Sequence, residues 1–324
     1  MKRTIRLFTA ALAALLLTAA PAAADDAVLT REHTIPLPGG GWVAATETYT
    51  EAALAAQPRR AALLFNGSAF NRHHWSIPVE HYDGTAILAR AGWIAFTVDY
   101  LGVGDSYVPA DGRDASFAAQ IEAMSTALDH VRAETGVQRV DLMGPGYGGA
   151  IAVVLAADPS RVRSTVTSAM LYDSPPIAGP LTDPAFIELL ENDADGYFFL
   201  PGEASLFFMI GAPQAALDYV AATQGGFYPV DNFLAAAYDL PFFDASAARA
   251  PGLVIFGPLD LVVGPNGVDG LLADYGPRGA VLATRPDADH APRVENPEIA
   301  AWYWEQSLAF LNQPHHPTGP LSAP

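Results

Sequence analysis

The sequence predicts a doubly wound α/β domain, in which helices cover both faces of a mostly parallel sheet. Short apolar runs typical of buried parallel strands recur along the chain, and segments with helical periodicity separate most of them. The runs are residues 61–65, 93–98, 140–143, 164–171 and 252–256. Because strands that alternate with helices become parallel neighbours, this order indicates one sheet with helices on both sides.

Other elements follow from the same reading. Residues 31–51 alternate apolar and polar positions around a Pro-Gly-Gly-Gly turn, which predicts an N-terminal antiparallel hairpin. A further strand is expected at residues 280–284. Periodic apolar positions predict helices at residues 85–90, 116–134, 149–157 and 297–311.

The first 24 residues have the composition of a signal peptide. Three basic residues precede an apolar run at residues 7–20, which closes on Ala22-Ala23-Ala24. The run is too short to span a bilayer, which takes about 20 apolar residues. We therefore expect cleavage after Ala24, a secreted or periplasmic protein, and no stable membrane insertion.

The remaining chain has the size of one α/β domain with an insertion. We expect a core at residues 25–171 and 248–313, a helical cap at residues 172–247 and a flexible tail at residues 314–324. Pro, Gly and many aromatic residues interrupt the cap segment. Its aromatic side chains either pack the cap onto the sheet or line an apolar substrate pocket, and the sequence leaves both alternatives open.

Composition excludes several functional classes. The chain has 35 acidic and 17 basic residues, a formal net charge of −18, so nucleic acid and anionic membranes are repelled. It contains no cysteine, which excludes disulfides, thiolate nucleophiles and cysteine metal ligands. We expect a small-molecule partner and neither a cofactor nor a metal, and the oligomeric state stays open.

A strand, a glycine-rich turn and a helix follow one another at residues 140–153. The turn reads Gly-Pro-Gly-Tyr-Gly-Gly at residues 144–149. Small residues let the strand and the helix pass closely, while the central residue adopts a strained backbone angle that raises its side chain above the sheet. This is the context of a nucleophile elbow, Gly-x-Ser-x-Gly, with Gly146 at the central position.

Two polar residues follow strands where such a site needs an acid and a base. Asp260 comes after the strand at residues 252–256, and His290 comes after the strand at residues 280–284. The acid orients the imidazole and stabilises its charged form. Asp173, at the end of another strand, is the rival acid. The other histidines lack this placement and are expected at the surface or in packing: His33, His73, His74, His81, His130, His315 and His316.

The turn Asn-Gly-Ser at residues 66–68 stands where half of an oxyanion hole is built. We expect the backbone N–H groups of Ser68 and Tyr147 to be its two donors. Main-chain donors survive any change of side chain at position 146, so the oxyanion hole is expected to persist.

Together these motifs resemble the α/β-hydrolase superfamily, in particular its secreted, capped members of the lipase and esterase type. The resemblance covers about residues 33–313 and includes the runs 66–68, 74–78 and 99–106, the elbow, Asp260 and His290. It implies an α/β-hydrolase fold, a nucleophile at position 146 and a mainly apolar ester as substrate. The chain departs from the family pattern at Gly146, where serine is expected, and at Asn66, where histidine is commoner.

Glycine at position 146 excludes ordinary acyl-enzyme catalysis there, because removal of such a nucleophile lowers turnover by about 10⁶-fold. We expect no nearby serine to replace it, since strand placement puts Ser106 and Ser168 elsewhere. Three hypotheses stay open. His290 with Asp260 acts as a general base in a hydrolase or lyase without a covalent intermediate; the chain is a ligand-binding pseudoenzyme; or glycine has been exchanged for the serine of an ordinary esterase.

A dinucleotide-binding oxidoreductase is a remote alternative. Gly144, Gly146 and Gly149 spell Gly-x-Gly-x-x-Gly between a strand and a helix. The motif, however, follows two earlier parallel strands, whereas dinucleotide-binding folds place it at the first strand-to-helix turn.

Overall fold

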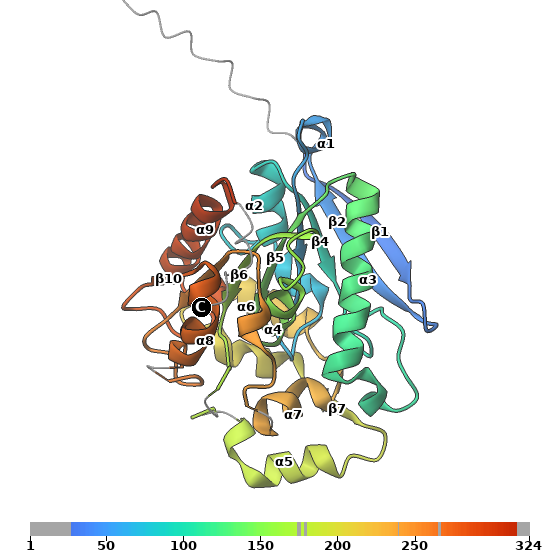
Figure 1. Ribbon diagram of the computed structural model, residues 1–324. Helices are drawn as coiled ribbons and strands as arrows, with labels where there is room; N and C mark the ends of the chain where they lie inside the picture. The colour runs from blue at the N-terminus through green and yellow to red at the C-terminus, as the bar shows by residue number, and fades with distance from the viewer. Residues whose placement is uncertain (1–26, 174–175, 178–179, 239, 265–266, 316–324) are drawn as a thin grey trace, which may run out of the picture.

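An eight-stranded sheet forms the centre of the molecule, which is represented by a computed structural model (Figure 1). The structure describes residues 27–173, 176–177, 180–238, 240–264 and 267–315. The predicted signal peptide and residues 316–324 of the predicted tail lie outside the described residues. Within the described part of the tail, His315 is buried and bonds the carbonyl of Phe310 at 2.8 Å.

The sheet has the strand order β1-β2-β4-β3-β5-β6-β9-β10. Its strands are β1 (Leu29–Pro36), β2 (Trp42–Tyr49), β3 (Ala61–Leu64), β4 (Ile94–Val98), β5 (Val140–Pro145), β6 (Val162–Ser168), β9 (Gly252–Phe256) and β10 (Ala280–Thr284). β2 pairs antiparallel with β1 and β4, and the remaining neighbours are parallel. The predicted, mostly parallel sheet with an N-terminal hairpin is confirmed.

Helices cover both faces because alternate strand residues point in opposite directions. In β3, Ala61 and Leu63 join the apolar cluster that contains α3 (Phe117–Thr135) and α4 (Gly146–Leu155). Ala62 and Leu64 join the cluster that contains α2 (Gly84–Arg90) and α9 (Pro297–Leu311), helices that Figure 1 also labels. The helices outside the β6–β9 connection are α1 (Glu51–Ala55), α2 (Gly84–Arg90), α3 (Phe117–Thr135), α4 (Gly146–Leu155), α8 (Asp269–Tyr275) and α9 (Pro297–Leu311).

The connection from β6 to β9 contains its own small elements. They are α5 (Pro184–Glu191), β7 (Tyr197–Leu200), α6 (Gln214–Thr223), β8 (Gly226–Pro229) and α7 (Asp231–Tyr238). The antiparallel pair β7–β8 was not predicted, because each strand is only four residues long and lies among aromatic residues. In Figure 1, α5, β7 and α7 lie together beyond one end of the sheet.

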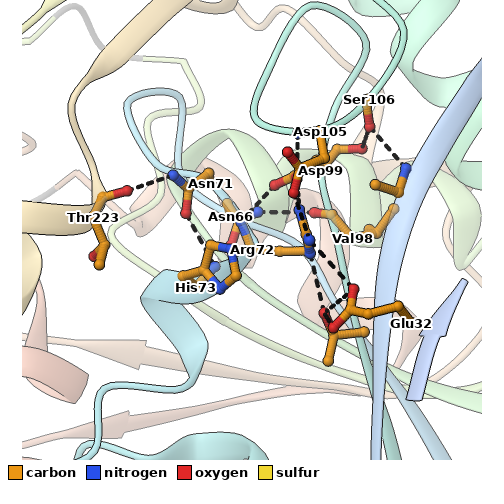
Figure 2. A network of polar contacts seen from close by, with 12 residues as sticks. Glu32, Asn66, Asn71, Arg72, His73, Val98, Asp99, Asp105, Ser106 and Thr223 are labelled. Carbon is orange, nitrogen blue, oxygen red and sulfur yellow. Dashed lines mark hydrogen bonds and ion pairs between the residues drawn. The ribbon is translucent and has the colours of Figure 1, made fainter. Parts of the chain in front are cut away.

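A buried ionic network joins the loop after β3 to the loop after β4 (Figure 2). Arg72 forms an ion pair with Asp99, which is inaccessible to solvent, and a second one with Asp105 at 2.7 Å. Asp99 also accepts the backbone N–H of Arg72 at 2.7 Å and that of Asp105 at 3.1 Å. Burial lowers the pKa of Arg72, but the charge of Asp99 and the bond to Asp105 outweigh burial and raise it. The network therefore fixes the loop that contains Ser68.

Replacement of Asp99 by asparagine should lower the free energy of unfolding by about 3 kcal/mol, because it removes the buried partner of the Arg72 charge. Asp287→Asn is the control, since Asp287 pairs with Arg285 at the surface and its loss should leave the denaturation midpoint nearly unchanged. Urea denaturation followed by circular dichroism measures both. Equal shifts for the two variants would contradict a structural role for the Arg72–Asp99 pair.

Candidate active site

Three glycines let the first turn of α4 pass against the ends of β3 and β5. A Cβ atom at Gly144 would lie 2.5 Å from the backbone carbon of Gly148, and one at Gly148 would lie 2.4 Å from the carbonyl oxygen of Asn66. A Cβ atom at Gly149 would lie 2.3 Å from the sulfur of Met170 and 2.8 Å from the carbonyl oxygen of Gly144. Packing therefore requires glycine at these positions.

Gly146 has a different environment. Its φ of +50° lies in the left-handed region, and a Cβ atom there would have only the carbonyl oxygen of Ala169 within 4 Å, at 3.3 Å. A side chain at position 146 would thus meet this one backbone atom and no other, at a backbone cost of roughly 1–2 kcal/mol for the left-handed angle. α4 begins at this residue, three positions earlier than the predicted start at 149, because the residues that follow Gly146 already form the first turn of the helix.

The two predicted oxyanion donors lie on one cavity. Tyr147 is in the first turn of α4, where backbone N–H groups have no acceptor within the helix. Ser68 lies in the turn after β3, and both residues line the cavity together with Gly146. The N-terminal end of α4 also contributes positive potential at this point. The arrangement suits an oxygen atom that gains negative charge.

His290 lines the same cavity and bonds Asp260. Its Nδ1 lies 2.9 Å from both carboxylate oxygens of Asp260. Asp260 is buried and also accepts the N–H groups of Val262 at 2.8 Å and Val263 at 2.9 Å. Because an ionised carboxylate only accepts hydrogen bonds, Nδ1 carries the hydrogen and Nε2 keeps a lone pair. The rival acid, Asp173, lies against Gly270 in α8.

The cavity has a volume of about 450 Å³ and an aromatic wall. Five phenylalanines of the β6–β9 connection line it: Phe186, Phe207, Phe208, Phe233 and Phe242. Phe208 lies 5.1 Å from the ring of His290. Phe198, in contrast, packs between Phe186 and Phe233 within the connection. The aromatic residues thus divide between the two roles that the sequence left open.

Ser168 lies closer to the elbow than strand placement suggested. It ends β6, pairs with Pro145 and lines the cavity, because β6 is the direct neighbour of β5. Its hydroxyl interacts with the buried phenol of Tyr303. Ser106 lies elsewhere, as expected, bonded to the N–H of Ala44 and the carbonyl of Asp99 at 2.9 Å each.

Five buried polar residues of the cavity wall lack hydrogen-bond partners for some of their side-chain atoms. The unpartnered atoms among the described residues of this wall are Nε2 of His74, the hydroxyl of Tyr147, Oγ of Ser205, both amide atoms of Asn232 and Nη1 of Arg293. The sequence placed His74 at the surface or in packing and gave no sign of Ser205, Asn232 or Arg293. His74 does pack, stacking on Phe70 at 3.8 Å. No local pattern marks these residues, since they come from five separate segments.

Glu295 supports the loop that contains His290. Both of its carboxylate oxygens lie 3.0 Å from the N–H of Asp289, and the side chain is buried. Burial raises the pKa of Glu295 to about 7, and the hydrogen bond from Asp289 offsets this only in part.

Metal and membrane features are absent from the described part of the chain. No three or more His, Asp or Glu side chains there are grouped so that they could hold a metal ion. None of the helices in the described ranges has the length and apolar character needed to cross a bilayer.

The fold and the site define the class of the protein: a doubly wound α/β domain with a glycine-rich elbow and a histidine–aspartate pair on one cavity is of the α/β-hydrolase type. Residues 82–254, more than half of the chain, match the family model described as alpha/beta hydrolase fold. The chain belongs to this family.

Known proteins similar to this chain include a peptidase and several hydrolases. A proline iminopeptidase of Lactobacillus delbrueckii subsp. lactis is 27% identical over 137 residues, which are 42% of this chain and 43% of that protein. The match thus spans less than half the length of this relative. A hydrolase from Pseudomonas aeruginosa PA01 has a TM-score of 0.65 at 21% identity, covering 87% of this chain and 99% of its own. A thermophilic esterase from Thermogutta terrifontis has a TM-score of 0.61 at 18% identity, covering 87% of this chain and 100% of its own.

Alanine substitutions at the elbow should destabilise the chain more at the close-packed glycines than at Gly146. Gly148→Ala should lower the free energy of unfolding by about 3 kcal/mol or more, because the new Cβ would collide with backbone. Gly146→Ala, whose Cβ would have a single contact, with the carbonyl oxygen of Ala169 at 3.3 Å, should cost only about 1–2 kcal/mol for its left-handed angle. Thermal and urea denaturation measure both. A Gly146 variant as damaged as the Gly148 variant would refute the distinction.

Glu295 should make stability depend on pH. Its pKa is raised from 4.5 to about 7 on folding, so between these values the folded chain holds more protons than the unfolded chain. Stability therefore falls as pH rises through this window, by up to about 3 kcal/mol above pH 7. Glu295→Gln, which does not ionise, should be the more stable protein at pH 8 and should lose this dependence.

The matched control for this prediction is Glu298→Gln, which changes a glutamate with an 87% exposed side chain. Denaturation midpoints measured from pH 4 to pH 8 should fall with pH in this control as they do in the natural chain. If Glu295→Gln keeps the same slope, another group is responsible for it.

Proposed function

We propose that this chain has an esterase-type or lipase-type hydrolase site that accepts a mainly apolar small-molecule ester, and that Gly146 deprives it of acyl-enzyme catalysis. The observation that carries the proposal is the cavity itself. It brings His290, the Ser68 and Tyr147 segments and position 146 together beneath an aromatic wall. Apolar walls with a few convergent polar groups are typical of small-molecule sites.

The chemistry that is left at the site belongs to its backbone and to His290. In related enzymes a serine at the centre of the elbow attacks the ester carbonyl. Without it, the oxyanion hole and substrate binding alone leave on the order of 10³- to 10⁴-fold acceleration over the reaction in water. The proposed site thus keeps its means of stabilising an oxyanion and loses its nucleophile.

A second candidate function is hydrolysis or elimination without a covalent intermediate. The specific observation in its favour is the intact hydrogen bond between His290 and Asp260 at 2.9 Å. The bond leaves Nε2 able to take a proton in the neutral imidazole, and Gly146 lines the cavity, which has room for a water molecule or a substrate atom. If neither reaction occurs, the same cavity makes the chain a ligand-binding pseudoenzyme.

Two further features complete the proposal. Residues 172–247 act as a cap, which is supported by the five phenylalanines that this segment contributes to the cavity wall. Residues 1–24 direct export, on the strength of their composition alone. Dinucleotide binding stays a remote alternative, since β5 is the third parallel strand along the chain and the cavity at its end is mostly apolar.

The decisive test restores the hydroxyl. Gly146→Ser should hydrolyse p-nitrophenyl esters of short and medium acyl chains at least about 10³-fold faster than the natural chain. Gly146→Ala is the matched control, because it introduces the same Cβ and the same backbone strain without a nucleophile. Adding His290→Ala to the serine variant should abolish the gain.

Different outcomes separate the candidates. A folded Gly146→Ser variant that binds the esters and stays inert refutes the esterase proposal. If the natural chain cleaves a substrate by itself and His290→Ala removes that activity, the reaction without a covalent intermediate is the function. Binding by all variants, with no turnover by any of them, favours the pseudoenzyme.

A further inference from the structure

A buried arginine without a carboxylate partner forms part of the cavity wall. Arg293 is 3% exposed and lies in the 3₁₀ turn Pro292–Val294, directly after the segment of His290. Its guanidinium lies over the ring of Trp75, 4.3 Å from the centroid. Within the described residues it forms no ion pair, and Nη1 has no hydrogen-bond partner.

The neighbouring histidine adds a second donor. Nη2 of Arg293 lies 2.5 Å from Nδ1 of His74, and because a guanidinium only donates, Nδ1 must accept. Burial, together with the charge of Arg293, lowers the pKa of His74 well below its ordinary value, so the imidazole is neutral. A neutral imidazole whose Nδ1 accepts carries its hydrogen on Nε2, which has no acceptor among the described residues.

A carboxylate is the chemical group that fits this unpaired guanidinium. One of its oxygens would accept the hydrogen bond that Nη1 of Arg293 lacks, and its charge would compensate a buried cation. A water molecule or a neutral carbonyl would accept the same bond and leave the charge uncompensated. The adjoining wall, with Phe70 and Phe208, is apolar.

Arg60 offers a comparison, because its guanidinium also stacks on a tryptophan but has hydrogen-bond acceptors within the chain. Arg60 lies over the ring of Trp93, 3.4 Å from its centroid. Its Nη1 bonds the side chain of Asn312 at 2.7 Å and its Nη2 bonds the carbonyl of Leu311 at 2.6 Å, and it does not line the cavity. Arg60 thus finds neutral acceptors within the chain, whereas Nη1 of Arg293 does not.

We propose that Arg293, oriented by His74, binds a carboxylate, so that the ligand of the cavity is an apolar molecule that carries an acid group. This inference rests on the proposed function in one respect, that the cavity receives a small apolar molecule. It requires no catalysis. The acid group lies at Arg293, apart from the oxyanion donors Ser68 and Tyr147.

Calorimetric titration of the natural chain with decanoate and with decanamide tests the proposal, since the two compounds differ only in the charged group. We expect decanoate to bind at least about tenfold more tightly, as is typical of hydrogen bonds to a charged group. Arg293→Met should remove this preference and leave decanamide affinity unchanged. Arg60→Met should keep the preference.

Three results would overturn the proposal: equal affinities in the natural chain, no binding of either compound, or a preference for the acid that persists in Arg293→Met. The last result would place the acid at the oxyanion donors. Should Arg293→Met not fold, a crystal structure of the natural chain with decanoate decides, with the carboxylate bonded either to Arg293 or to the N–H groups of Ser68 and Tyr147. All readouts measure binding, so failure of Gly146→Ser to cleave esters would leave this result standing.

Discussion

The close approach of the first turn of α4 to the ends of β3 and β5 is the constraint on which the site depends. Gly144, Gly148 and Gly149 have no room for a Cβ atom. Their packing brings the start of α4, with Tyr147, onto the cavity. Position 146 differs from these three glycines, because a Cβ atom there would approach only the carbonyl oxygen of Ala169, at 3.3 Å. The architecture of the elbow is therefore independent of the residue that would perform covalent chemistry, and it persists with glycine there.

Loops after separate strands complete the site, and a buried polar interaction holds each loop. The Arg72–Asp99 pair fixes the segment of Ser68. Backbone N–H groups of Val262 and Val263 hold Asp260, which in turn orients His290. Buried charges of this kind are strongly destabilising when one partner is removed. They hold the residues of the candidate site in place by limiting the conformations open to each loop.

The fold could be predicted because strands that are buried on both faces of a sheet are apolar along most of their length. The parallel strands β3, β4 and β9 are apolar runs, and the hairpin alternates, so these elements were visible without a structure. β6 is less plain, because four of its seven residues are Ser or Thr. The start of α4 was not visible, since residues 146–148 are typical of a loop in sequence although they form the first turn of the helix. β7 and β8, of four residues each among aromatic residues, are too short to show the alternation of apolar and polar positions that marks a strand.

The site was predictable only where its residues follow strands. Asp260 and Asp173 both follow strands, so the sequence could not decide which of them is the acid. The structure decides for Asp260, because His290 bonds it. Ser168 was misplaced because the neighbour relation of β5 and β6 is not a local property. His74 and Arg293 lie 219 positions apart. Two residues so far apart leave no pattern in one sequence. They become a candidate site only in the folded chain, where Nη1 of Arg293 and Nε2 of His74 have no hydrogen-bond acceptor among the described residues.

The charge of the molecule acts differently at its surface and in its cavity. The chain as a whole carries a formal charge of −18, which at long range repels an acid. Salt screens that repulsion beyond about 8 Å at physiological ionic strength. Arg293 is buried, so its attraction for a carboxylate acts at contact, where screening by water is weak. Selection of an acidic ligand therefore occurs after entry into the cavity, by the buried guanidinium of Arg293, and the screened negative surface opposes it only weakly.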